Sequence, residues 1–150
     1  MGLTSVYTPQ IIVNGRRELV GSDRDKLTDA VSKALNKNAK AAFTNLHVTV
    51  TDMQKVTVNY EAKGDLSDCE VHFALVSKHE STSVKRGENS GRQLSHTNVV
   101  RQFITKPADT KGNLSFSQSS ITDTSNILVI AYIQHINDLS IIAAAQAMVK

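Results

Sequence analysis

Most of the chain alternates apolar and polar residues along short segments, the pattern of β-strands with one buried face. The candidate strands lie at residues 48–51, 56–60, 71–75, 96–105, 113–118, 126–135 and 140–149. Clusters of Pro, Gly, Asp and Asn separate them, and no helical period lies between them. Seven short strands over roughly 100 residues predict two antiparallel sheets packed face to face, and we expect an immunoglobulin-like sandwich.

The last segment, residues 139–150, is open to two interpretations. Its run Ile-Ile-Ala-Ala-Ala-Gln-Ala-Met has helical propensity. Asn137-Asp138, between two apolar runs, favours a hairpin instead. We take the segment as a strand.

A different pattern precedes the strands. Pro9 opens a short apolar segment, and Asn14-Gly15 accepts the positive φ angles of a tight hairpin turn, so the chain should return as residues 16–20. A helix is expected next, because Ser22 followed by Asp25 is typical of a capped helix N-terminus. Its apolar stripe is Leu27, Ala30, Val31, Ala34 and Leu35. We therefore divide the chain into a ββα unit, residues 1–43, and a β-sandwich, residues 44–150.

Composition excludes several classes of function. The single cysteine, Cys69, leaves no internal disulfide and no Cys-x-x-Cys pair, and we expect it to be a small buried hydrophobe. The longest apolar run, residues 127–133, is far short of the roughly 20 residues that a membrane helix needs. A pI of about 9.1 is typical of many nucleic-acid-binding proteins. The net charge is only +3, however, and aromatic residues are 5%, so we do not expect this chain to bind nucleic acid.

The first segment resembles a known fold. Residues 7–16, Tyr-Thr-Pro-Gln-Ile-Ile-Val-Asn-Gly-Arg, followed by Val-Gly-Ser-Asp and a helix, resemble the second half of a thioredoxin-like domain. With Arg86-Gly-Glu-Asn-Ser-Gly-Arg92 and residues 96–101, they are similar to the bacterial domain-of-unknown-function family 1223, whose members are secreted proteins with a thioredoxin-like part and a β-rich part. The resemblance implies a cis bond before Pro9, and a peptide site shaped by Thr8 and Pro9.

The chain departs from that family at one point. The family's Cys-x-x-Cys lies upstream of the Thr-Pro, and only six residues precede Tyr7 here. We therefore expect a truncated, non-catalytic fragment without a cofactor, whose sandwich is an accessory module of a redox domain. The full-length protein would then be a thiol-disulfide oxidoreductase, periplasmic or secreted, although a cytosolic location stays open. The ββα unit is too small to stand alone, so it should pack on the sandwich, on the missing half or on a second copy. The alternative is that the hairpin and helix are unrelated to thioredoxin and resemble it only in these short motifs.

One polar cluster suggests a binding site. The candidate residues are Arg86, Glu88, Asn89, Arg92, His96, Asn98 and Arg101, in and after a loop expected at residues 83–96. Its arginines could hold a carboxylate or phosphate, or a protein partner, so a stand-alone binding module using residues 85–101 is our alternative function. Charge clusters of this kind are more often solvated loops, and His96 and Asn98 could simply bond to the backbone.

Residues for catalysis or metal binding are scattered. The histidines lack metal-ligand spacing, and the Ser-rich stretch at residues 115–120 lacks the Gly-x-Ser-x-Gly elbow of a hydrolase. An enzyme with an unrecognised site would need a pocket that brings His96 beside a carboxylate such as Glu88.

Overall fold

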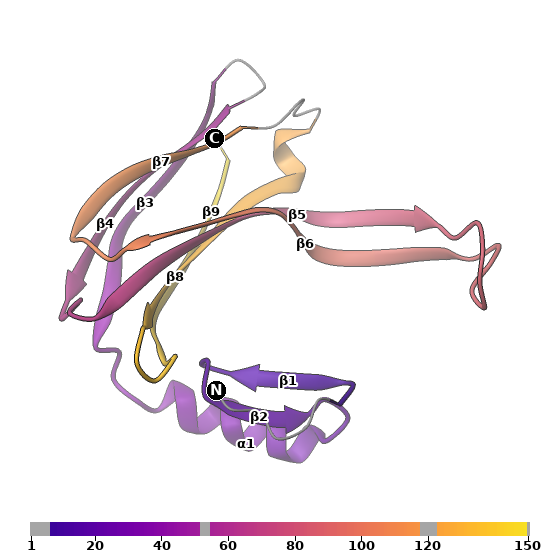
Figure 1. Cartoon of the computed structure of the whole chain (residues 1–150), viewed down its shortest axis with the longest axis horizontal. Coiled ribbons are helices and arrows are strands. Elements are labelled where there is room, and N and C mark those ends of the chain that lie inside the picture. The colour runs from indigo at the N-terminus through magenta and orange to yellow at the C-terminus, as the bar shows by residue number, and fades with distance from the viewer. Residues whose placement is uncertain (1–6, 52–54, 118–122, 150) are drawn as a thin grey trace.

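The computed structural model describes residues 7–51, 55–117 and 123–149, and these form a mainly β protein with one α-helix (Figure 1). The first unit holds β1 (Gln10–Val13), β2 (Arg17–Val20) and α1 (Arg24–Leu35). The strands that follow are β3 (Ala41–Thr51), β4 (Lys55–Gly64), β5 (Cys69–Ser83), β6 (Gln93–Pro107), β7 (Lys111–Ser117), β8 (Ile127–His135) and β9 (Ile141–Met148). A 3-10 turn, η1 (Thr124–Asn126), precedes β8. Of the predicted strand ends and segments, Gln118 and Lys150 lie outside the described residues.

The first unit follows the sequence pattern closely. β1 and β2 pair as an antiparallel hairpin, and Asn14 and Gly15 hold φ angles of 48° and 72° at the turn. The helix begins one residue later than expected: Asp23, not Ser22, is the N-cap, and its carboxylate accepts a 3.1 Å hydrogen bond from the amide of Lys26. A carboxylate also opposes the positive end of the helix dipole, which favours Asp in this position.

The predicted apolar stripe of the helix is only partly covered. Ala30 is buried against the hairpin, and Leu27 and Ala34 are half-buried. Val31 and Leu35 keep 39% and 79% of their surface exposed. The short hairpin offers one narrow face, so it covers one side of the stripe and leaves the other to solvent.

Seven strands make the second unit, as the alternation predicted. β3, β4 and β7 form one antiparallel sheet in the order β3-β4-β7, and β6, β5, β8 and β9 form another in the order β6-β5-β8-β9. Both sheets contribute to one core, whose largest fully buried side chains are Phe73, Phe116, Leu75 and Ile133. The last strand, β9, pairs with β8 across a turn that contains Asn137 and Asp138, so the hairpin interpretation of residues 139–150 is confirmed.

The edges of the two sheets meet on both sides of the core. On one side, Lys106 of β6 donates a 2.9 Å hydrogen bond to the carbonyl of Asn113 in β7, and the amide of Gln102 bonds the carbonyl of Ser117. On the other side, β3 lies beside β9. These side-chain donors bond backbone carbonyls at the edge of the sheet. Carbonyls left free at such an edge could pair with a strand of another molecule.

Two boundaries differ from the sequence prediction. β3 begins at Ala41, well before the strand expected at residues 48–51, and a bulge between Phe43 and Asn45 disturbs the alternation that would have revealed its start. The loop expected at residues 83–96 is shorter, because β5 continues to Ser83 and β6 already begins at Gln93. Only residues 84–92 connect the two strands.

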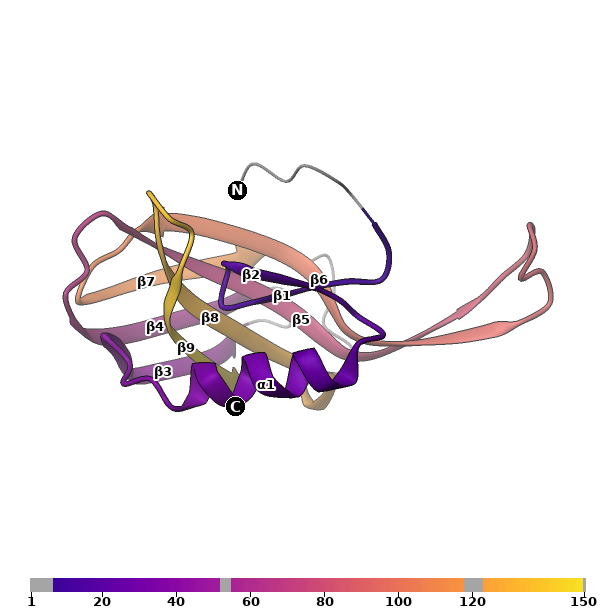
Figure 2. The same cartoon turned by 90° about the horizontal axis from the view of Figure 1, so that it is seen from below.

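The outer ends of β5 and β6 project from the body as a two-stranded arm, residues 78–97 (Figures 1 and 2). Its sequence is polar on both faces, so alternation there carries no burial signal, and a solvated loop was the natural expectation. Backbone pairing from His79 to Ser83 holds the arm in register.

Candidate functional site

The tip of the arm carries four of the predicted site residues. Arg86, Glu88, Asn89 and Arg92 are all exposed in the connection between β5 and β6. The backbone closes on itself, because the amide of Gly91 donates a 2.9 Å hydrogen bond to the carbonyl of Val84. Among the described residues, neither arginine forms an ion pair within 4.0 Å, so both guanidinium groups face solvent at the end of the projection.

The base of the arm holds the remaining predicted residues. Arg101 donates through Nε to the hydroxyl of Ser77, at 2.9 Å, and through Nη2 to the carboxylate of Glu80. His96 is the cross-strand partner of Glu80. The hydroxyl of Ser77 and the guanidinium of Arg101 lower the pKa of Glu80. The predicted cluster is therefore divided between a free cationic tip and a base where the charge of Arg101 is already matched.

The strand predicted at residues 96–105 does not alternate regularly, so His96, Asn98 and Val100 do not share one continuous face. Asn98 adopts a φ of 55°, and a bulge opposite Leu75 and Val76 leaves Arg101 as an extra residue of β6. Each irregularity changes which way the following side chains point. The alternation of apolar and polar residues in the sequence does not reveal these two irregularities.

Thr8 and Pro9 lie where the chain enters β1, and both are exposed. The peptide bond between them is cis. The carbonyl of Pro9 accepts a 2.7 Å hydrogen bond from the amide of Gly21, which ties the entry to the end of β2. A Cβ at Gly21 would lie 3.0 Å from the Cβ of Pro9, so the two ends of the hairpin are in close contact.

A buried histidine that was not among the predicted site residues lies between two aromatic rings. His72, 7% exposed, lies between Phe103 and Tyr132, with ring centroids 5.6 and 4.7 Å away. Its Nδ1 is 2.9 Å from the hydroxyl of Thr105, and its buried Nε2 has no hydrogen-bond partner. Burial lowers the pKa of His72, and the Glu70 carboxylate opposes that shift only in part. The ring is thus held neutral against the face of a sheet.

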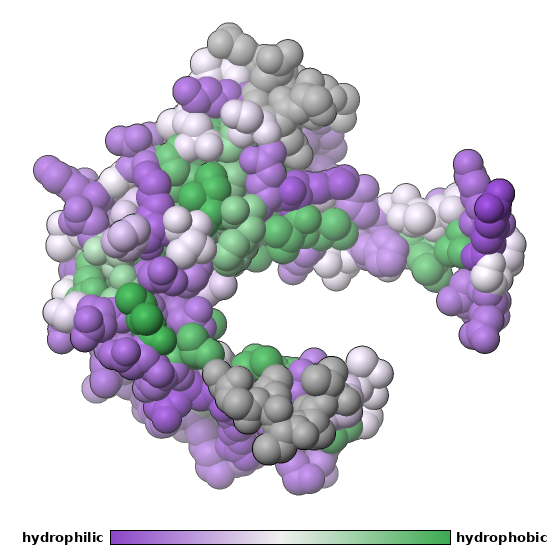
Figure 3. All heavy atoms as spheres, viewed as in Figure 1, coloured by the Kyte–Doolittle hydropathy of each residue, from purple (hydrophilic) through white to green (hydrophobic). Residues whose placement is uncertain are grey.

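The His72 ring lies on the outer face of the sheet β6-β5-β8-β9, which points away from the main core. Ala74, Val76 and Leu128 form a second apolar cluster there, beside the exposed Val100 and Phe103. Apolar surface lines the hollow between the sandwich and the first unit in Figure 3. The alternation in residues 71–75 predicted that His72 and Ala74 form the solvent face of a half-buried strand. That prediction is wrong, because β5 is buried on both faces from Val71 to Ser77. The nearly continuous apolar run Val-His-Phe-Ala-Leu-Val was the available signal.

His96 and Glu88, which the catalytic hypothesis requires side by side, are not brought together. His96 faces Glu80 across the arm, whereas Glu88 lies at the tip. In the described ranges, no three His, Cys, Asp or Glu side chains gather as a metal site would require. Cys69 is buried, and desolvation raises the pKa of its thiol. None of the helical residues that the structure describes forms a segment long and apolar enough to cross a bilayer.

Comparison with known families places the chain. The family model described as a protein of unknown function, DUF1223, matches residues 1–134. The chain belongs to this family. No curated protein matches the sequence. Among solved structures, a domain of the outer membrane lipoprotein Omp28 from Porphyromonas gingivalis is similar to this DUF1223 member, with 14% identity, a TM-score of 0.48, and coverage of 76% of this chain and 91% of that one.

Proposed function

We propose that this chain is a non-catalytic docking module, in which the ββα unit and the sandwich together receive a thioredoxin-like redox domain outside the cytoplasm. The observation that carries the proposal is the face of the hairpin that none of the described residues covers, called the uncovered face below. Arg17, on one face, pairs with Asp29 of α1 at 3.4 Å, so that face meets the helix. Ile12 and Val20 lie on the other face and are 46% and 47% exposed.

The uncovered face calls for a partner on physical grounds. A two-stranded hairpin is at best marginally stable in water, and here it has one helix on one side only. The outer face of the sheet β6-β5-β8-β9 presents Val100 and Phe103, the cross-strand partners of Val76 and Ala74, and these two side chains are 55% and 51% exposed. Apolar surface lines the hollow between the sandwich and the first unit (Figure 3). The hairpin face also carries Gln10 and Glu18, joined by a 3.0 Å hydrogen bond, so it offers an occupant both polar and apolar contacts. Two surfaces with exposed apolar side chains that face a common hollow favour an occupant that touches both.

A thioredoxin-like domain is the occupant that fits the sequence resemblance. Residues 7–35 resemble the second half of such a domain, and its first half would add strands beside β1 and a helix over Ile12 and Val20. The chain's single thiol, Cys69, is buried with a raised pKa. Thiol-disulfide exchange would therefore belong to the partner, with Thr8 and Pro9 at the edge of its peptide site.

We also assign the sandwich to the immunoglobulin-like class. Its first, second and fifth strands (β3, β4, β7) form one sheet, and its third, sixth and seventh (β5, β8, β9) lie in the other, as in that class. The fourth strand, β6, joins the second sheet beside β5. This fold class does not by itself define what the module binds, so the docking proposal depends on the exposed side chains of the two faces.

Docking is tested by titrating the isotope-labelled chain with a thioredoxin-like domain from a family member that carries a Cys-x-x-Cys pair. We expect chemical-shift changes at Val20 and Phe103. Val20→Asp and Phe103→Asp should each weaken binding at least about tenfold, which corresponds to about 1.4 kcal/mol. Leu35→Asp, on the exposed end of α1, is the matched control and should bind normally.

Three outcomes would overturn the proposal. Equal binding by all three variants would place the interface elsewhere. Concentration-dependent dimerisation that Val20→Asp abolishes would assign the hollow to a second copy of the chain. Disulfide-exchange turnover by the chain alone would contradict a non-catalytic module.

A second function, recognition of an anionic ligand, is favoured by the arm. Residues 78–97 hold four Lys or Arg and two Glu, and Arg86 and Arg92 are free at the tip. Titration with inorganic phosphate and with a short acidic peptide tests it. Arg86→Ala with Arg92→Ala should abolish binding, while Lys63→Ala, on the far end of β4, should not. Binding that the double variant retains would exclude the tip.

A further inference from the structure

The outer face of the sheet β3-β4-β7 presents an ordered array of polar side chains. Backbone register aligns them in three rows across the strands. One row is Asn45, Glu61 and Lys111, and the next is His47, Asn59 and Asn113. A third row, Thr49, Thr57 and Ser115, continues the array. All six side chains of the first two rows are exposed.

The sheet fixes the spacing of this array. Neighbouring strands are about 4.8 Å apart, and residues two apart on one strand are about 7 Å apart. Hydrogen-bonding groups therefore repeat at distances close to the width of a sugar ring. A β-strand framework holds them in place without a loop closing over them.

The amide groups of the array are not used within the molecule. Among the described residues, the side-chain hydrogen bond on this face is the 3.3 Å contact between the hydroxyls of Thr57 and Ser115. Asn45, Asn59 and Asn113 leave their side-chain donors and acceptors to solvent, and Glu61 and Lys111 form no ion pair within 4.0 Å although their residues are cross-strand partners. An amide offers both donors and an acceptor, which matches a hydroxyl group in either role.

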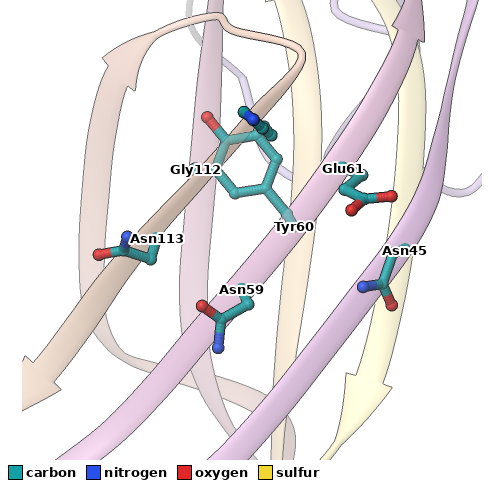
Figure 4. A pocket seen from close by; sticks show the side chains of 7 residues that line it. Asn45, Asn59, Tyr60, Glu61, Gly112 and Asn113 are labelled. Carbon is teal, nitrogen blue, oxygen red and sulfur yellow. The ribbon is translucent and has the colours of Figure 1, made fainter.

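Five of the six side chains of the first two rows, all but His47, border a shallow hollow of about 420 Å³ that is open to solvent (Figure 4). Asn45, Asn59, Glu61 and Asn113 surround it. The bulge between Phe43 and Asn45 directs Asn45 to the rim. Gly112 lies beneath, where a Cβ would come within 2.9 Å of the Tyr60 ring on the core side.

The charges select the class of ligand. Among the residues that line the hollow, Glu61 and Lys111 contribute one charge of each sign, so the lining has no net charge. Neutral groups supply the remaining donors and acceptors. We propose that this face binds a neutral oligosaccharide through the side chains of Asn45, Asn59, Glu61, Lys111 and Asn113.

Weak binding is expected from this arrangement. Each hydrogen bond replaces one to water, and no exposed aromatic ring among the described residues of this face provides a stacking platform. We expect Kd on the order of 1 mM for a trisaccharide. Several sites presented together, or a longer glycan, would raise the apparent affinity.

The test is titration of the isotope-labelled full chain with cellotriose, maltotriose and chitotriose. The NMR chemical shifts of the backbone amides and of the side-chain NH₂ groups are measured at each step. At least one trisaccharide should shift Asn59 and Asn113. Asn59→Ala combined with Asn113→Ala should raise Kd at least about tenfold. Asn38→Ala, an exposed asparagine beyond α1, is the matched control and should leave Kd unchanged.

Absence of shifts with all three sugars would overturn the proposal, as would unchanged affinity in the double variant. Shifts produced only by a neutral polar peptide would reassign the face to protein recognition. The site lies on the sheet opposite the hollow of the docking module, so the double variant should bind the thioredoxin-like domain normally. Failure of one proposal is thereby separated from failure of the other.

Discussion

The amide nitrogen of Ile141 donates a 3.1 Å hydrogen bond to the carbonyl oxygen of Asn14, and so joins the start of β9 to the tip of the first hairpin. Arg16 and Asp138 form an ion pair at 3.1 Å beside this bond. The turn between β8 and β9 therefore supports the ββα unit at one end, while the rest of its hairpin face remains open. This junction sets the hollow that the docking proposal uses.

Gly15→Ala should disrupt the junction. A Cβ at Gly15 would lie 1.9 Å from the carbonyl oxygen of Leu139, and the residue has a φ of 72°. The left-handed backbone alone costs an alanine about 1–2 kcal/mol, and the clash adds to it. Gly87→Ala is the control, because Gly87 has a φ of 88° but no atom within 4 Å. Urea unfolding should show the larger loss for Gly15→Ala, with faster amide exchange at Ile141; equal losses would contradict the junction.

The stability of the fold should depend on pH through His72. Its pKa is lower in the folded protein than the ordinary 6.5, because burial disfavours the imidazolium. As pH falls, the unfolded chain binds a proton at this imidazole before the folded protein does. The contribution of neutral His72 to the free energy of unfolding is therefore fully present above about pH 6.5, and it is lost as pH falls through the lowered pKa of the folded protein. Chemical unfolding at several pH values should show this loss. His72→Phe, which keeps an aromatic ring, should flatten the difference; an unchanged slope would place the titration elsewhere.

Two phenylalanines on opposite faces of the same sheet should differ in stability. Phe73 is fully buried in the main core, and Phe73→Ala should cost about 3–5 kcal/mol through lost burial and a residual cavity. Phe103 is 51% exposed, and Phe103→Ala should cost about 1 kcal/mol, the order of one aromatic contact. Thermal denaturation measures both. Comparable losses would show that the outer face is as tightly packed as the core.

The ionisation of Glu80 should report on the base of the arm. The hydroxyl of Ser77 is the largest cause of its lowered pKa, and the guanidinium of Arg101 adds to it. Ser77→Ala should therefore raise the pKa of the Glu80 carboxyl toward its ordinary value, as followed by carboxyl NMR. Arg86→Ala, at the far tip, should leave it unchanged. A shift in the tip variant would show that the arm folds back on its base.

The candidate sites divide between sequence and structure in an instructive way. Arg86 and Arg92 were visible in the sequence, because charged residues that flank two closely spaced glycines mark an exposed turn. The engagement of Arg101 with Ser77 was not, since it depends on a bulge that shifts the register of β5 against β6. The rows of Asn45, Asn59 and Asn113 come from three strands far apart along the chain. Their alignment exists only in the paired sheet.

Local chemistry decided the elements of this protein, and non-local pairing decided its surfaces. Asn14-Gly15 required a turn, and the alternation of residues 48–51 and 56–60 required half-buried strands, since both depend on neighbours in the chain. The length of the arm, the burial of β5 on both faces and the hollow beside Val20 depend on which strands pair and in what register. Single-sequence periodicity contains no information on that choice, because every partner lies outside the window in which the period is seen.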